Sequence, residues 1–168
     1  MTAYSSSNPY KVSGRFITTT FVAAIMFDLI AWPREYFFWL PEACLLVLIY
    51  WVLHRPESIN IGIAFCIGLV MDLSLSSPLG QHAISYSIIA FLASQQHRQL
   101  LLYHYGFQAI AVGGFFLLHA GIMILVRLFY DQIFYGWLYF TPAITVAILW
   151  PLLNTLMVGI MHWRQNKR

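Results

Sequence analysis

Long apolar runs separated by short polar breaks dominate the pattern of this chain. There are six such runs, at residues 16–32, 38–53, 59–75, 81–94, 106–129 and 139–163. A helix needs about 20 residues to cross the hydrocarbon core of a bilayer, so the pattern predicts six transmembrane helices joined by short loops. The third and fourth runs are short for a span, which leaves a five-span alternative open.

The composition also indicates a protein that is surrounded by lipid. Of the 168 residues, 60% are hydrophobic and only 9% are charged, and a soluble core of this size could not bury that much apolar surface. We therefore predict an all-α integral membrane protein, a six-helix bundle. It has one transmembrane domain at 16–163, an N-terminal tail at 1–15 and a basic tail at 164–168.

The basic residues predict the orientation. With six spans and a cytoplasmic N-terminus, seven Lys and Arg residues fall on the cytoplasmic side, and only Arg34 and Arg127 fall outside. Cytoplasmic loops normally carry the excess of Lys and Arg. An odd number of spans would export the basic C-terminal tail, so we expect both termini in the cytoplasm.

Ionisable residues inside the apolar runs share one depth. At 1.5 Å per residue, Asp28, Asp72 and His119 lie about 20 Å from the cytoplasmic face, Glu42 falls in the same outer third, and Arg127 lies just above. An ionisable group costs roughly 2.5–3.5 kcal/mol at the centre of a span, so it normally faces protein or water. The sequence predicts a polar cluster or an outward-open cavity in this layer.

Three interpretations of this layer stay open: a structural polar network, a partner-binding surface, and ligand or proton chemistry. Glu42 lies in the first turn of its helix, where a carboxylate suits the positive helix end, whereas Asp72 lies near a C-terminus, where the dipole disfavours it. For His119 the alternative to a functional role is a neutral imidazole bonded within the bundle. Arg127 and Asp131 are four residues apart and predict a surface ion pair.

Small residues recur at helical spacing in three runs, on faces where another helix can approach closely. In the first and third runs an aspartate, Asp28 or Asp72, ends the series at positions i, i+4 and i+8. Pro151 lies inside the last run and predicts a kink. The small residues are Thr20 and Ala24 in the first run, Ala64 and Gly68 in the third, and Ala83, Ser87, Ala90 and Ser94 in the fourth.

No motif for catalysis, metal binding or nucleic-acid binding stands out. The sequence lacks H-E-x-x-H, G-x-S-x-G, a Walker loop and paired cysteines. Cys44 and Cys66 lie in apolar runs without nearby ligands, so we expect neither a disulfide nor a metal site. The basic tail is short and suits a membrane surface. The sequence thus predicts a protein that has no cofactor, is not an enzyme and does not bind nucleic acid.

The stretch 41–92 resembles the bacterial rod shape-determining protein MreD family. It combines a proline that opens a helix, "LLVLIYW", Pro56, "GLVMD" at 68–72 and "LG" at 79–80, and "LWP" at 149–151 resembles the family's last helix. Glu42 departs from the Asp or Asn expected in that motif. Asp28 and His119 match nothing in the family pattern, so their roles rest on depth alone.

The resemblance implies a multi-pass protein of the bacterial inner membrane, with a fold similar to the S component of energy-coupling-factor transporters. It further implies a non-catalytic scaffold of the cell-elongation machinery that maintains rod shape. Such a scaffold binds MreC and, in a larger complex, works with MreB filaments, RodA and its partner transpeptidase in peptidoglycan synthesis. On this view Asp72→Leu weakens partner co-purification more than it lowers the amount of folded protein.

Two other functions stay open at this stage. By analogy of fold, the chain could bind a small molecule or a lipid intermediate, with the outer polar layer as its site. Alternatively, Asp28, Asp72 and His119 could form the relay of an intramembrane enzyme or a proton-coupled carrier.

Overall fold

The computed structural model describes residues 13–30, 39–131 and 137–166. Within these residues the chain forms six α-helices, one short 3-10 helix and no β-strand. Each predicted apolar run therefore overlaps one α-helix. The elements are α1 (Gly14–Asp28), α3 (Ala43–His54), α4 (Ile61–Ser74), α5 (Gln81–Leu102), α6 (Tyr105–Asp131), η1 (Trp137–Phe140) and α7 (Thr141–Asn166).

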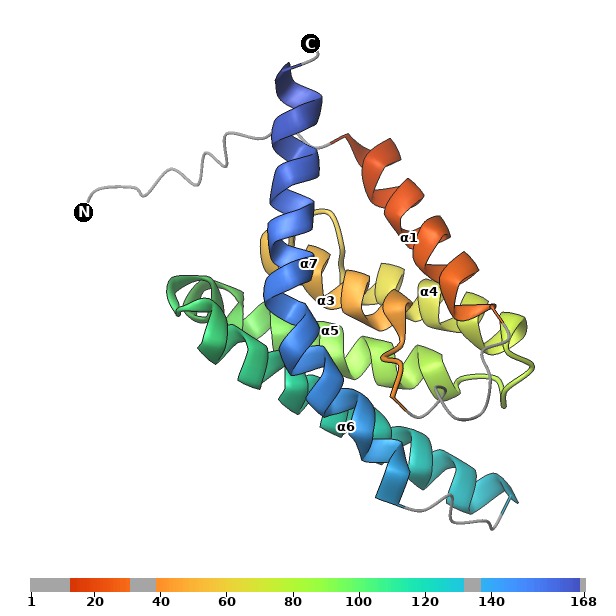
Figure 1. The fold of residues 1–168 in the computed structure, drawn as a ribbon. Helices are drawn as coiled ribbons and strands as arrows, with labels where there is room; N and C mark the ends of the chain where they lie inside the picture. The colour runs from red at the N-terminus through yellow and green to blue at the C-terminus, as the bar shows by residue number, and fades with distance from the viewer. Residues whose placement is uncertain (1–12, 31–38, 132–136, 167–168) are drawn as a thin grey trace.

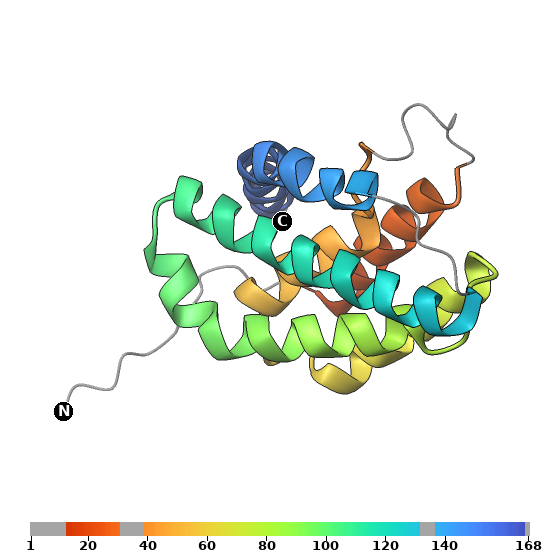
Figure 2. The ribbon, with the colours of Figure 1, turned by 90° about the horizontal axis from the view of Figure 1, so that it is seen from below.

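Successive helices run back and forth, as Figures 1 and 2 show. The helix α3 packs against α1 and α5, and α5 also packs against α4 and α6. The last two helices, α6 and α7, form a further antiparallel pair. The helices α3 and α5 thus connect the other helices of the bundle to one another.

The centre of the bundle is α3. Every residue from Cys44 to Leu53 is buried, as expected for a helix that is apolar on all sides. The one polar atom on the Trp51 ring, its indole N–H, donates to Thr20 Oγ1 at 2.9 Å. This bond joins α1 to α3, because a buried indole N–H needs an acceptor.

The helices α4 and α5 meet at a glycine. A Cβ atom built on Gly68 would lie 2.4 Å from Ala83 Cα and 2.6 Å from Ala83 N, so only glycine fits there. Ala64 and Ala90 are also buried, and the half-buried Ser87 donates its hydroxyl to the Ala83 carbonyl at 2.7 Å. The close helix approach at Gly68 is therefore a contact between two helices of this chain.

Only two helices are long and apolar enough, by length and composition, to cross a bilayer: Gly106–Tyr130 and Leu138–Met157, within the described residues. The apolar helices α3 and α4 have 12 and 14 residues, about 18 and 21 Å at 1.5 Å per residue. These lengths fall short of a hydrocarbon core of about 30 Å. The helix α5 continues past the predicted end at 94 to Leu102, because Gln and Arg, though polar, favour helices.

The last helix changes direction in its middle. Figure 2 shows its first half lying alongside α6 and its second half nearly end-on. Pro151 lies inside this helix and removes one backbone hydrogen bond. On either side of it, Trp150 Nε1 and Asn154 Nδ2 donate to Gln108 Oε1 of α6, at 3.2 and 3.4 Å. This buried polar cluster holds the bend against α6.

Candidate functional site

The carboxylate of Asp72 caps the start of α5. It accepts backbone N–H groups from Gly80 at 2.9 Å, His82 at 2.8 Å and Ala83 at 3.3 Å. Gly80 is the N-cap of α5, has a φ of 96° and carries no side chain that could cap the helix. Asp72 supplies the capping oxygens instead and places negative charge at a positive helix end.

This cap changes the prediction for Asp72. The dipole of its own helix disfavours the carboxylate, but the N-terminus of α5 favours it. Asp72 is 0% exposed, and its Oδ1 also accepts the Ser77 hydroxyl at 3.0 Å and lies 2.8 Å from His82 Nδ1. Since no partner can reach this carboxylate, we now expect Asp72→Leu to lower folded protein and partner co-purification together.

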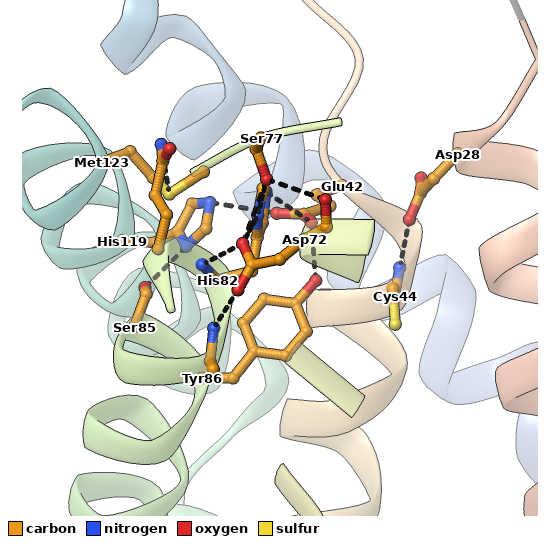
Figure 3. Close-up of polar contacts among 12 residues, drawn as sticks. Asp28, Glu42, Cys44, Asp72, Ser77, His82, Ser85, Tyr86, His119 and Met123 are labelled. Atoms are coloured by element: carbon orange, nitrogen blue, oxygen red, sulfur yellow. Dashed lines mark hydrogen bonds and ion pairs between the residues drawn. The ribbon is translucent and has the colours of Figure 1, made fainter. Parts of the chain in front are cut away.

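Glu42 joins three helices at this end of the bundle. It is the N-cap of α3, but its side chain makes no capping bond. Instead, Oε1 accepts the Tyr86 hydroxyl at 2.6 Å, and Oε2 lies 3.0 Å from His119 Nε2. His82 Nε2 approaches Oε1 at 3.5 Å. Figure 3 shows the carboxylate among these three rings.

The polar chain ends at a buried serine. The second ring nitrogen of His119, Nδ1, lies 2.8 Å from Ser85 Oγ. Ser85, His119 and Glu42 thus follow the serine–histidine–carboxylate order of a hydrolase triad, with the two ring nitrogens exchanged. Ser85 is 0% exposed in the helix interior, however, so no substrate carbonyl can reach its oxygen. The described residues also contain no group of three side chains arranged to hold a metal ion.

Asp28 forms a second cap nearby. It is the last residue of α1, and its two carboxylate oxygens accept the backbone N–H groups of Ala43 and Cys44, each at 2.8 Å. These are the first residues of α3, so the carboxylate again lies at a positive helix end. In Figure 3 Asp28 stands apart from the network around Glu42.

A cleft of about 1240 Å³ lies beside both caps. It is bounded by the end of α1, the start of α3, the turn after α4, the second half of α6 and the start of α7. The Arg127 guanidinium lies 5.8 Å from the centre of the Tyr139 ring, and both residues line the cleft. The other polar lining residues are Asp28, Glu42, Ser76, Ser77, His82, His119 and Tyr130.

The structure therefore brings the five polar candidates to one end of the bundle. Glu42, Asp72 and His119 belong to one network, while Asp28 and Arg127 line the same cleft. The side chain of Asp131, the predicted partner of Arg127, lies outside the described residues.

Sequence reasoning missed four members of the network. The fourth apolar run was expected to enter the membrane from the outer side at residue 81, so the depth rule could have placed residues 82–86 in the same layer. Only its small residues were considered. The missed members are Ser77, His82, Ser85 and Tyr86.

Comparisons with known proteins agree with the resemblance of residues 41–92 to the MreD family. Residues 11–159 match the model of a family described as rod shape-determining protein MreD. The rod shape-determining protein MreD of Haemophilus influenzae is 32% identical over 141 residues, which cover 84% of this chain and 87% of that protein. No solved structure was found to match the chain.

Proposed function

The chain belongs to the rod shape-determining protein MreD family, and from that premise we propose that it is a non-catalytic scaffold of the cell-elongation machinery. Membership of the family implies a role in determining rod shape. We place the chain in the bacterial inner membrane as six spans with both termini in the cytoplasm. The alternating direction of the six α-helices in the described residues supports this topology.

One observation carries the scaffold proposal: the buried carboxylate of Asp72 and the half-buried carboxylates of Asp28 and Glu42 hold helices of the chain itself. Asp72 caps α5, Asp28 caps α3, and Glu42 ties α3 to α5 and α6. Ser85, which has the connectivity of a nucleophile, is sealed inside the bundle. A bundle braced in this way is suited to presenting a fixed surface to partner proteins.

The partner that we propose first is MreC, bound directly. MreB filaments, RodA and its partner transpeptidase would join in a larger complex that links the cytoskeleton to peptidoglycan synthesis. Because Gly68 and Ala83 meet inside the bundle, a partner helix must use another surface. A groove of about 410 Å³ between α1 and α4 is one candidate, lined by Ile25, Gly62 and Cys66 among others.

The test is to extract the tagged chain gently from its native membrane and to identify what accompanies it by mass spectrometry. MreC as the dominant companion supports the scaffold. The exposed thiol of Cys66 then allows the groove to be tested by cross-linking, with the buried Cys44 as the control. Recovery of the chain without any protein of the elongation machinery would contradict the proposal.

A second candidate function is the binding of a small molecule or a lipid intermediate, which a fold like that of the S components would allow. The observation that favours it is the cleft of about 1240 Å³ beside Glu42 and His119. Its test is a stoichiometric ligand in the purified protein. A sample that carries no ligand after gentle extraction would count against it.

A further inference from the structure

The two carboxylates that line the cleft keep unused capacity to accept hydrogen bonds. Each oxygen of Asp28 accepts one backbone N–H, and Glu42 Oε2 contacts His119 Nε2 at 3.0 Å. A carboxylate oxygen offers two acceptor sites. Among the described residues, the ion pairs of Glu42 are with His82 and His119, and Asp28 has none. A ligand that carries N–H donors and positive charge would complement them.

The cleft also has a basic group. Arg127 lines it beside Tyr139, 5.8 Å from the centre of that ring. A guanidinium group presents several N–H donors in a planar fork that matches phosphate oxygens. The cleft therefore offers acceptors for a cation and donors for an anion, which is the charge pattern of a zwitterion.

Apolar side chains form the remainder of the lining. Among them, Leu79, Phe129 and Leu138 are 72%, 83% and 53% exposed. The volume of about 1240 Å³ exceeds the roughly 300–1,000 Å³ of ordinary small-molecule pockets. Charged groups next to exposed apolar side chains suit an amphiphile, whose head enters the cleft and whose chains stay in lipid.

We propose that this cleft binds the headgroup of a membrane amphiphile that carries a primary ammonium and a phosphodiester. The ammonium lies at Asp28 and Glu42, and the phosphate lies at Arg127. A primary ammonium has three N–H donors for the open acceptor sites, whereas a trimethylated one has none. This inference rests on the binder function, the second candidate above, and is independent of MreC binding.

The experiment uses the purified full-length chain in detergent and native mass spectrometry. Phosphatidylethanolamine, phosphatidylcholine and phosphatidylglycerol with identical acyl chains are offered in equal amounts. We expect the ethanolamine lipid to be retained at least tenfold more than either other lipid. Equal retention of all three overturns the proposal and indicates lipid held around the bundle without headgroup recognition.

A soluble competitor separates the two sources of this headgroup. Glycerophosphoethanolamine, the lipid without its acyl chains, carries the same charges but cannot use the apolar lining. We expect it to displace the lipid only at concentrations at least a hundredfold higher. Displacement at equal concentration would assign the site to a free small molecule and overturn the lipid part of the proposal.

Two variants locate the headgroup. Glu42→Gln should abolish the preference for ethanolamine over glycerol, while Arg127→Gln should weaken retention of both lipids. Glu57→Gln and Arg98→Gln, at exposed positions away from the cleft lining, should change neither. If Glu42→Gln fails to fold, Arg127→Gln carries the test, and an unchanged lipid profile there overturns the proposal. MreC co-purification from Arg127→Gln membranes is scored separately, so loss of lipid and loss of scaffold are distinguishable.

Discussion

Two helix pairs in this bundle use the same device. In α1–α3 and in α4–α5, an aspartate at or near the end of the first helix caps the start of the second. Small residues precede each aspartate at the same spacing: Ala24 before Asp28 and Gly68 before Asp72. The spacing puts the small residue and the aspartate on one helix face, so helix contact and helix capping occur together.

The two caps differ in depth and in number of bonds. Asp28 is half-buried and accepts two backbone N–H groups. Asp72 is fully buried and accepts three, with Ser77 and His82 as further partners. A buried charge is costly unless hydrogen bonds compensate it. Of the two capping aspartates, the more deeply buried one therefore has the larger number of hydrogen-bond partners.

The largest difference between the caps should come from removing the carboxylates. Asp72→Ala leaves buried N–H groups and an imidazole without their acceptor, and we expect a loss of about 3–5 kcal/mol. Thermal unfolding in detergent measures it. Glu57→Ala removes an exposed carboxylate and should have little effect. An Asp72→Ala protein with the melting temperature of the wild type would contradict the prediction that this cap stabilises the bundle.

The two helix pairs also differ in how closely their helices approach at the small residue. Ala24 already carries a Cβ atom, whereas a Cβ on Gly68 would meet the backbone of Ala83 at 2.4 Å. We expect Gly68→Ala to cost about 1–3 kcal/mol, because α4 and α5 must move apart. Gly114→Ala is the matched control, since no atom lies within 4 Å of its new Cβ. Equal melting temperatures for the two variants would contradict the close contact.

The shallower cap should matter less. Asp28→Ala removes the acceptor for Ala43 and Cys44 at the start of α3, and loss of a helix cap costs about 0.5–2 kcal/mol. The measurement is the same melting experiment, with Asp72→Ala beside it. A loss for Asp28→Ala that equals or exceeds the loss for Asp72→Ala would break the relation between depth and number of bonds.

We expect the smallest loss of stability from the hydrogen bond between Trp51 and Thr20, which joins α3 to α1. The described residues show no equivalent bond between α4 and α5. Thr20→Val keeps the side-chain shape but removes the acceptor for the Trp51 indole, at about 0.5–1.5 kcal/mol. Thr19→Val is the control, because its hydroxyl makes only a local bond to the Phe16 carbonyl. Intrinsic tryptophan fluorescence, to which Trp51 contributes, should shift in the first variant and not in the second. Identical spectra would argue against the bond.

Hydrophobic pattern predicted the helices well, and depth predicted much of the site. Glu42, Asp72 and His119 come from three different helices, yet a count of 1.5 Å per residue placed them in one layer, and the structure joins them through His82. Depth predicts these contacts because an ionisable group within the membrane needs polar partners, and such partners must lie at the same depth.

The sequence did not predict how each helix is rotated about its axis, nor which helix each side chain contacts. A depth count does not say that Asp72 turns toward the N-terminus of the following helix, so the dipole argument included only the helix that carries Asp72. It also did not distinguish a small-residue face that packs inside the chain, as Gly68 does, from one that receives a partner. The hydrogen bond from Trp150 to Gln108 links residues that are 42 positions apart in sequence. Helical periodicity shows which residues share a face of one helix, so it does not predict this contact between two helices.

Under the scaffold proposal, the polar residues brace the bundle and catalyse no reaction. The most direct measurement compares rod-shape rescue with the amount of folded protein, in cells that lack their own copy of this gene. Ser85→Ala, Asp28→Ala and Asp72→Ala should fall on one line, with rescue proportional to folded protein. A Ser85→Ala protein that reaches the wild-type level and still leaves the cells round would contradict the account.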